Sequence, residues 1–214
     1  MTLSEENYLK VIYHLSADLQ VISTNAIADK MQTKASSATD MIKKLSEKGL
    51  VAYKKYQGVT LSETGVHAAR MIVRKHRLWE VFLVDKLAFA WDEVHEIAEQ
   101  LEHIQSEELI NKLDDFLGNP IVDPHGDAIP DRTGKMTLTK QRVLADLPEG
   151  DGGHLVGVKD SSAAFLQYLD KQQLTLGSRI QVLEKEAFDE SMVLDVNGRQ
   201  KSVSQKIARQ LLLD

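Results

Sequence analysis

The 214-residue chain contains no cysteine. Without thiols it can form neither disulfide bonds nor thiolate metal sites, so any metal site must use histidine, carboxylate, amide or backbone atoms. It also lacks an apolar run near the roughly 18 residues that a membrane-spanning helix needs. Its first residues, Met1 to Glu6, do not have the basic and then apolar pattern of a secretory signal peptide. These absences indicate a cytoplasmic protein with no part in the membrane.

Positive charge is scarce overall but unevenly distributed. The formal net charge is −6, yet residues 1–75 carry 11 Lys and Arg against 7 Asp and Glu, whereas residues 76–214 carry 15 against 25. A basic beginning followed by an acidic remainder indicates a polyanionic partner at one end and cation binding at the other. A solvated surface with uneven charge is the alternative interpretation of the same counts.

The first 61 residues have the pattern of three helices followed by a hairpin. The apolar positions of the helices fall in 8–15, 27–31 and 38–45, and the extended segments are 50–53 and 59–61. Ser4 and Glu5 are expected to cap the first helix, and Gly49 is expected to end the third in a left-handed conformation. The hairpin tip includes Tyr56. This order predicts a winged helix-turn-helix, a fold that reads DNA.

The third helix and the hairpin tip, the wing of such a fold, carry the candidate DNA contacts. These are Lys34, Ser36, Ser37, Thr39, Asp40, Lys43, Lys44, Lys54 and Lys55. The residues up to Asp40 lie at the N-terminal end of a helix that fits a major groove, and the later lysines can neutralise phosphates. Alternatively, Ser36 and Ser37 only cap the helix and the lysines form a solvated face. Asp40 repels a polyanion, so we expect it either to read a cytosine or to be held away from the DNA.

The remaining chain divides at a loop rich in proline and glycine. A long helix is expected from Ser62 to Phe89, followed by helices over 91–104 and 106–117. Residues 118–136 hold three of the four prolines of the chain. Beyond this loop, the sequence predicts strands at 154–158, 179–183 and 192–196, a helix at 162–169 and a hairpin at Asn197-Gly198. The expected fold class is therefore mainly α with a small β-barrel at the C-terminal end.

Histidines and carboxylates recur at helical spacing in the middle of the chain. His76 and Glu80 are four residues apart, and His95, Glu99, Glu102 and His103 form one helical stripe. Imidazole and carboxylate ligands suit Mn, Fe, Co, Ni or Zn, whereas a single histidine would more simply be a hydrogen-bonded surface residue. His95-Glu96 begins like the H-E-x-x-H motif of zinc enzymes, but Glu99 stands where the second histidine should be. We therefore expect a metal-binding protein with no catalytic residues.

These stretches resemble the diphtheria toxin repressor family of iron- and manganese-dependent regulators over nearly the whole length. The motifs that carry the resemblance are Glu6-Asn7-Tyr8-Leu9, Arg74-Lys75-His76-Arg77-Leu78 with Glu80, Val94-His95 with Glu99, Glu102-His103 and Ser106, and Asp123-Pro124-His125-Gly126. The resemblance implies one site formed by Asn7, Glu99, Glu102 and His103. It implies a second site formed by His76, Glu80 and His95, to which Asp123, His125 and Asp160 add ligands, although Asp123-Pro124 is alternatively an ordinary turn.

Three positions bear on which metal the chain would bind. Position 7 is usually Met or Asp in the family and here is Asn, a neutral oxygen donor, which puts the affinity of the first site in doubt. Glu99 replaces the Cys of the iron-responsive branch, and Asp123 stands where Cys is usual in the manganese-responsive branch. Hard oxygen ligands favour Mn(II), but the order of intrinsic affinities favours Fe(II) over Mn(II). We therefore expect the chain to bind Mn(II) or Fe(II). Two sites per subunit are implied.

The resemblance also implies how the parts cooperate. The expected domains are a winged helix-turn-helix at 1–72, a helical metal-binding and dimerisation domain with its linker at 73–136, and an SH3-like (FeoA-like) domain at 137–214. Metal would fix the angle between the first two domains of a homodimer, so that it binds operator DNA and represses metal-uptake genes. Ile97, Leu101 and Leu109 are expected either at the dimer interface or in the core. The alternatives are a winged-helix regulator of a non-metal small molecule, a metalloenzyme and a metal-storage protein.

Overall fold

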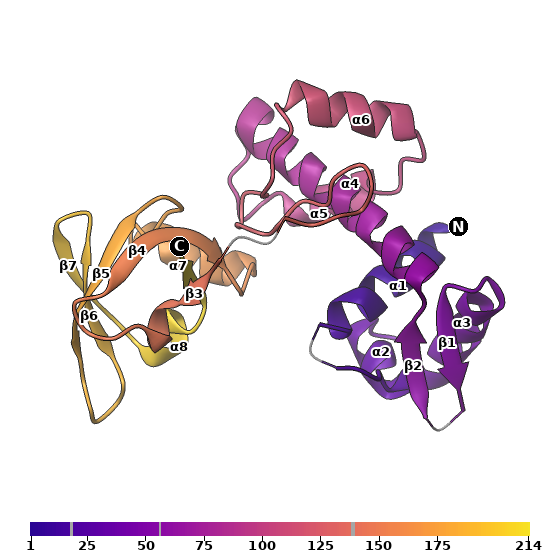
Figure 1. Cartoon of the computed structure of the whole chain (residues 1–214), viewed down its shortest axis with the longest axis horizontal. Coiled ribbons are helices and arrows are strands. Elements are labelled where there is room, and N and C mark those ends of the chain that lie inside the picture. The colour runs from indigo at the N-terminus through magenta and orange to yellow at the C-terminus, as the bar shows by residue number, and fades with distance from the viewer. Residues whose placement is uncertain (18, 56, 138–139) are drawn as a thin grey trace.

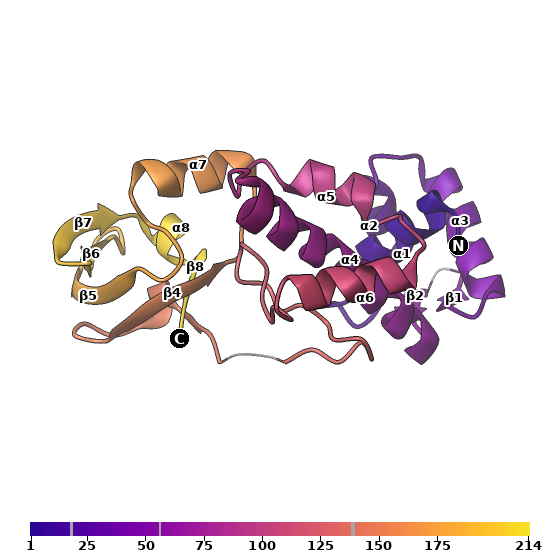
Figure 2. The ribbon, with the colours of Figure 1, turned by 90° about the horizontal axis from the view of Figure 1, so that it is seen from above.

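The structure, a computed structural model, describes residues 1–17, 19–55, 57–137 and 140–214. Three units follow one another along its long axis (Figures 1 and 2). The N-terminal unit lies at one end and the C-terminal unit at the other, and a helical unit joins them. No helix in the described part of the chain is long and apolar enough to cross a membrane.

The N-terminal unit contains the three helices and the hairpin that the sequence predicts. They are α1 (Leu3–Leu15), α2 (Thr24–Lys30), α3 (Ala35–Glu47), β1 (Val51–Lys54) and β2 (Gly58–Leu61). Strands β1 and β2 pair in antiparallel register from Val51–Leu61 to Lys54–Gly58. Leu9, Ile12, Ile42 and Leu45 are fully buried between the helices, because each lies on the apolar face of its helix. Tyr56 of the predicted hairpin tip lies outside the described residues.

The ends of these helices differ in part from the expectation. Thr2, rather than Ser4, caps α1: its Oγ1 accepts a hydrogen bond from the Glu5 amide, and the Glu5 carboxylate accepts one from the Thr2 amide. This reciprocal capping box requires a Glu three residues after the cap, a spacing that Thr2 meets and Ser4 does not. The left-handed Gly49, with φ of +70°, follows α3 as predicted.

The middle unit is built around one long helix. It consists of α4 (Glu63–Leu87), α5 (His95–Leu101) and α6 (Glu107–Phe116), and α5 and α6 flank α4 (Figures 1 and 2). Ala69 and Ile72 in the first half of α4 belong to the core of the N-terminal unit, whereas Leu78 and Val81 in the second half belong to the core of the middle unit. Because α4 is continuous, it transmits the position of one core directly to the other.

Helix α5 is shorter than the predicted segment 91–104. Ala88 adopts a left-handed conformation, with φ of +58°, and residues 91–93 form a turn before α5 begins at His95. Residues 118–136 form the predicted loop after α6, and this loop returns along α4. Arg70 of α4 donates a hydrogen bond to the carbonyl of Gly134, and Val122 pairs with Ala128 in an isolated bridge.

The C-terminal unit is a small antiparallel β domain. Its strands are β3 (Arg142–Val143), β4 (Gly152–Val158), β5 (Arg179–Lys185), β6 (Met192–Val196), β7 (Arg199–Val203) and β8 (Leu211–Leu213), with α7 (Ala163–Lys171), α8 (Gln205–Ala208) and a 3-10 turn at Leu144–Asp146. Their order in the sheet is β3-β8-β4-β5-β6-β7. Asn197-Gly198 forms the predicted hairpin, with φ of +51° and +82°. The end strands β3 and β7 do not pair with each other among the described residues, so the sheet is open rather than a closed barrel.

The C-terminal unit docks on the middle unit through backbone contacts. The amide of Val158 in β4 donates a hydrogen bond of 3.0 Å to the carbonyl of His125, and Gln141 donates to the carbonyl of Gly126. Gly126 has a φ of +89°, and a Cβ at this position would lie 2.1 Å from the carbonyl oxygen of Val156. Only glycine allows this close approach, because any side chain would collide with the backbone of β4.

Replacing Gly126 by Ala should separate the loop from β4. Gly118 is a matched control, because its φ is +80° but an added Cβ meets no atom within 4 Å. We expect Gly126→Ala, but not Gly118→Ala, to remove the hydrogen-exchange protection of the Val158 amide, which donates to His125. Equal protection of this amide in both variants would contradict the docking described here.

Candidate metal centre

Glu80 is the centre of a cluster of buried ionisable side chains. It lies one turn after His76 on α4, so both side chains project from the same face of the helix. Nε2 of His76 lies 2.9 Å from Oε1 of Glu80, and the two residues are 8% and 2% exposed. A carboxylate this deeply buried needs partners, because an isolated charge is costly away from water.

The first residue of α5 adds a third ligand group. Nδ1 of His95 lies 3.4 Å from Oε1 of Glu80 and 3.2 Å from Nε2 of His76. One carboxylate oxygen and two imidazole nitrogens therefore face one another, and His95 leaves the cluster open to solvent because half of its side chain is exposed. The turn that precedes α5 brings His95 back against α4.

The second oxygen of Glu80 faces the loop between α6 and the C-terminal unit. Nδ1 of His125 lies 3.6 Å from Oε2 of Glu80 and 3.9 Å from Oδ1 of Asp123, and both loop residues are buried. Oδ1 of Asp123 also accepts hydrogen bonds from the amides of His125 and Asp127, so it shapes the turn. Arg77 approaches the other oxygen of Asp123 at 3.4 Å.

His125 is held in a tautomer that suits metal binding. Its Nε2 lies 2.9 Å from the carbonyl oxygen of Trp91 and donates a hydrogen bond to it, which turns Nδ1 toward Glu80. Once Nδ1 has lost its proton, the ring can offer the Nδ1 lone pair to the cluster, as in metal sites where the second nitrogen of a histidine is fixed by a hydrogen bond. The indole ring of Trp91 also stacks on His125, with ring centroids 6.2 Å apart.

The donor atoms match the expected metals. His76, Glu80 and His95 form one group and Glu80, Asp123 and His125 form another, and in each group the ligand atoms lie within 4.8 Å of one another. Both groups share Glu80. Nitrogen and hard oxygen donors without thiolate fit Mn(II) and Fe(II). Five of the six residues predicted for the second site are therefore brought together.

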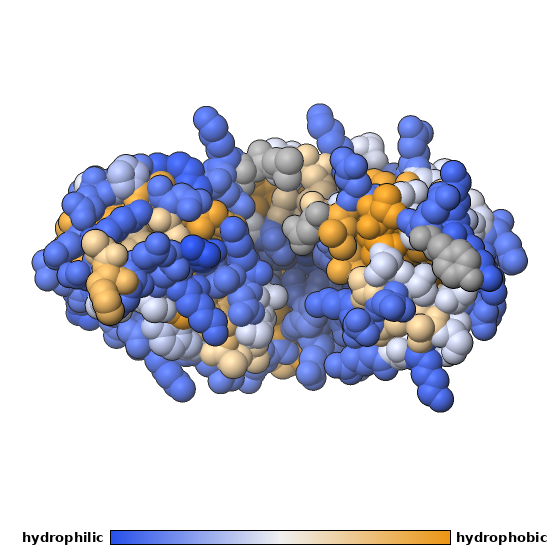
Figure 3. Space-filling view, turned by 90° about the horizontal axis from the view of Figure 1, so that it is seen from below, coloured by the Kyte–Doolittle hydropathy of each residue, from blue (hydrophilic) through white to orange (hydrophobic). Residues whose placement is uncertain are grey.

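Asp160, the sixth, is not part of either group. It is exposed, and its Oδ1 accepts a hydrogen bond from the Ser162 amide at the start of α7. Its neighbours Lys159 and Ser161 do line a hollow of about 590 Å³ that also includes Glu80. From below, a hollow with a mostly hydrophilic surface lies between the two ends of the molecule (Figure 3).

Among the described residues, Glu99, Glu102 and His103 of the predicted first site do not belong to either group of closely spaced ligand atoms. Glu99 and Glu102 both contact the Nζ atom of Lys10, at 3.2 Å and 2.7 Å, whereas Nδ1 of His103 contacts Glu6 at 2.7 Å. Oδ1 of Asn7 is buried and accepts no hydrogen bond from the described residues. Lys10 and Glu6 were not predicted as members of this cluster, because helical spacing does not relate residues of α1 to residues 92 and 97 positions later in the chain.

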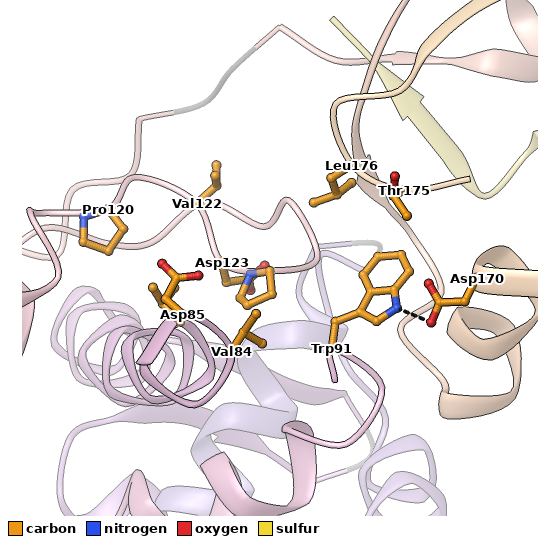
Figure 4. A pocket seen from close by; sticks show the side chains of 11 residues that line it. Val84, Asp85, Trp91, Pro120, Val122, Asp123, Asp170, Thr175 and Leu176 are labelled. Atoms are coloured by element: carbon orange, nitrogen blue, oxygen red, sulfur yellow. Dashed lines mark hydrogen bonds between the residues drawn. The ribbon is translucent and has the colours of Figure 1, made fainter. Parts of the chain in front are cut away.

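A mostly apolar cavity of about 430 Å³ lies beside the cluster, between α4, the loop and the C-terminal unit (Figure 4). Asp123 and Trp91 both line it, and the Trp91 indole donates a hydrogen bond of 3.0 Å to Asp170 of α7. Trp91 thus contacts both the C-terminal unit and a member of the cluster. Its role was also missed, because nothing in the sequence pairs it with His125.

The candidate DNA contacts lie on α3 and the hairpin. All are exposed except Thr39, which is half-buried and donates to the carbonyl of Ala35. Ser36, Thr39 and Lys55 line a surface hollow of about 680 Å³ between the start of α3 and the hairpin. The N-cap of α3 is Lys34, so Ser36 and Ser37 lie in its first turn rather than at the cap.

Two of the remaining charged candidates form a pair on α3. Asp40 contacts Lys43 at 3.3 Å, so a neighbouring cation partly offsets its negative charge. Lys34 and Lys44 of α3 and Lys54 of β1 are also exposed. This end of the molecule therefore presents a helix N-terminus and several cations to solvent.

Three family models cover almost all of the chain. Residues 1–59 match "Iron dependent repressor, N-terminal DNA binding domain", and residues 62–131 match "Iron dependent repressor, metal binding and dimerisation domain". Residues 142–214 match the "FeoA domain". The order of the three models is the order of the three structural units.

Similar proteins carry related descriptions. A probable metal transport system membrane protein of Chlamydia trachomatis is 44% identical over 91 residues, which are 42% of this chain. The iron-dependent repressor IdeR of Mycobacterium tuberculosis is 32% identical over 125 residues, which are 58% of this chain. The alignments span 20% of the chlamydial protein and 54% of the mycobacterial repressor, so this chain matches only part of each relative.

One solved structure matches over nearly the full length of both chains. It is described as a manganese-dependent transcriptional repressor in complex with manganese. It is 35% identical, covers 98% of each chain and has a TM-score of 0.86. The arrangement of all three units is therefore shared with a manganese-bound repressor.

Proton binding at the cluster follows from its contacts. Burial lowers the pKa of His76, but hydrogen bonds to Glu102 and Glu80 outweigh burial and raise it to about 9. Burial also lowers the pKa of His125, but the hydrogen bond to Glu80 and its negative charge outweigh burial and raise this pKa to about 9. Burial raises the pKa of Asp123 to about 7, whereas hydrogen bonds from the three imidazoles hold the pKa of Glu80 well below its usual range.

Metal binding should therefore release protons and strengthen with pH. At pH 7 both nitrogens of the His76 ring and of the His125 ring are protonated, because both pKa values are raised to about 9. A metal must replace one proton on each ring to bind a ring nitrogen. We expect affinity for Mn(II) to rise between pH 6 and 8 by roughly tenfold per pH unit for each proton released. Calorimetric titration in buffers of different ionisation enthalpy counts these protons, and binding that releases none would contradict the prediction.

Proposed function

The chain belongs to the iron-dependent repressor family, whose members are metal-dependent DNA-binding regulators and not enzymes, and we propose that it represses transcription when Mn(II) or Fe(II) occupies the Glu80 cluster. The observation that carries this proposal is the convergence of buried imidazole and carboxylate groups from three separate segments on one glutamate. His76, Glu80 and His95 come from α4 and α5, and Asp123 and His125 come from the loop.

A metal bound there would connect elements that lead to both ends of the molecule. Helix α4 continues into the core of the N-terminal unit, and the carbonyl of His125 accepts a hydrogen bond from β4 of the C-terminal unit. Ligation at Glu80 would hold α4, α5 and the loop in one relative position. Metal increases the fraction of molecules in this arrangement only if it binds this arrangement more tightly than the others. Metal binding therefore favours the arrangement in which the ligands converge on Glu80.

The metal-loaded state would present α3 to DNA. We propose that the start of α3 enters a major groove, where Ser36, Ser37 and Thr39 reach base edges. Lys34, Lys43, Lys44, Lys54 and Lys55 would lie along the phosphates. Since Asp40 contacts Lys43 at 3.3 Å, we propose that this pair holds Asp40 away from the phosphates rather than using it to read a base.

Two subunits would be needed to read a symmetric operator. The middle unit exposes the large apolar side chains Leu87, Phe89, Leu109, Phe116 and Ile121. Ile97 and Leu101, in contrast, are partly buried against the core of this unit. We propose that Leu109 and Phe116 of α6 contribute to a two-fold interface, because exposed apolar side chains of this size are stabilised by burial. Sedimentation as a monomer at micromolar concentration would contradict a dimer.

The domain organisation and setting follow from the same proposal. We propose boundaries at 1–72, 73–136 and 137–214. The gap between the second and third matched segments, 62–131 and 142–214, supports the second boundary. The first two matched segments meet near residue 60, so the boundary at 72 rests on Ala69 and Ile72, which pack in the N-terminal core. The match of the last unit to the FeoA domain supports an SH3-like fold, whose role here would be to anchor the loop that carries His125. A repressor of this kind acts where the DNA is, in the cytoplasm, and its targets would be genes for metal uptake.

Operator binding should depend on metal through Glu80. In a gel-shift titration with operator DNA under anaerobic conditions, we expect Mn(II) or Fe(II) to promote binding and a chelator to reverse it. Glu80→Gln removes the shared carboxylate and should weaken metal-promoted binding by at least about 100-fold, because this oxygen pair faces all three imidazoles. Glu96→Gln, on the exposed side of α5, is the matched control and should bind like the unaltered protein.

Two outcomes would contradict the proposal. DNA binding that is unaffected by metal and by chelator would favour a regulator of a different effector. Equal behaviour of Glu80→Gln and Glu96→Gln would mean that the sensing metal binds elsewhere.

A further inference from the structure

An ammonium group lies where the first predicted metal site would place a cation. Lys10 of α1 is 8% exposed, and its Nζ lies 2.7 Å and 2.8 Å from the two carboxylate oxygens of Glu102. The same atom lies 3.2 Å from Oε1 of Glu99. Two of the four residues expected to bind metal are therefore already neutralised in part by a side chain of this protein.

The other two residues do not complete a coordination shell around these carboxylates. Asn7 is neutral, and among the described residues nothing donates to its buried Oδ1. His103 directs Nδ1 to Glu6, whereas its Nε2 lies 3.9 Å from Glu102. The site as built thus offers two carboxylates shared with an ammonium, one amide oxygen without a partner and one imidazole engaged elsewhere.

The Glu80 cluster has no comparable cation on its central ligand. In the described part of the chain, the ionisable partners of Glu80 are His76, His95 and His125, and no Lys or Arg contacts it. Arg77 approaches Asp123 on Oδ2, the oxygen that does not face His125. A divalent ion at Glu80 would therefore meet no Lys or Arg on that carboxylate, whereas one at Glu102 would have to displace or lie against the Lys10 ammonium, which is unfavourable in a poorly solvated site.

We propose that Lys10 is the resident cation of the first site, so that a divalent ion enters this site only by displacing the Lys10 ammonium. This inference rests on the proposed metal-sensing function and adds to it a side chain that competes with metal. Without metal, the ion pairs of Lys10 with Glu99 and Glu102 hold α1 against the end of α5.

The competition between Lys10 and Mn(II) at the first site can be measured without DNA. Full-length protein is titrated with Mn(II), and the free ion is followed by its electron paramagnetic resonance signal. We expect one tightly bound Mn(II) per subunit and a second step at least tenfold weaker. Lys10→Met keeps the apolar stem of the side chain but removes the charge, and it should strengthen the second step at least tenfold while the first step stays unchanged. Lys10→Arg, which keeps a cation, is the matched control and should show no gain.

Two further variants locate the second step. Asn7→Asp adds a carboxylate to the residues of the first site and should strengthen the second step with Lys10 still present, which places this step at the first site even if Lys10→Met folds poorly. Glu99→Gln in the Lys10→Met background should reverse the gain, because Glu99 contacts Lys10 and lies outside the Glu80 cluster.

The outcomes separate this inference from the proposed function. Two steps of equal affinity in the unaltered protein, or a second step that neither Lys10→Met nor Asn7→Asp strengthens, would overturn the role of Lys10 and leave metal sensing intact. Absence of any tight Mn(II) binding would overturn both.

Discussion

A buried carboxylate placed between imidazoles on both of its sides organises this molecule. Glu80 is 2% exposed, and its two oxygens face different partners: His76 and His95 on one side, His125 on the other. Without metal, the raised pKa values of His76 and His125 keep these two imidazoles protonated at pH 7, and their charge balances that of Glu80. A divalent ion can replace those protons and bind the same nitrogen and oxygen atoms. Protons and metal therefore compete for the groups around the buried glutamate.

The contacts of the Glu80 cluster connect metal binding to the other two units. Helix α4 carries Glu80 in its second half and packs into the DNA-reading unit with its first half, while the loop that carries His125 is fixed to β4 by the Val158 amide. Through Glu102, which contacts both His76 and Lys10, the cluster also reaches α1. A local change in coordination therefore acts on contiguous packed elements and not on flexible segments.

The His76–Glu80 pair could be predicted from spacing, because residues four apart on one helix share a face. The approach of His95 depends on how a turn packs α5 against α4, and helical spacing alone does not report that angle. His125 was expected only through resemblance to a family, since a loop residue 45 positions after Glu80 carries no periodic signal. Lys10 was missed because it pairs with a residue 92 positions away, and such a contact exists only in the folded chain.

The central claim is that the Glu80 cluster is the principal metal site. Anomalous diffraction at the manganese absorption edge, from crystals of the full chain grown with one equivalent of Mn(II) per subunit, tests it most directly. The account predicts one dominant anomalous peak per subunit, within bonding distance of the Glu80 carboxylate and of at least two of its neighbouring imidazoles. A dominant peak at Glu102 with none at Glu80, or no ordered peak at either carboxylate, would contradict it.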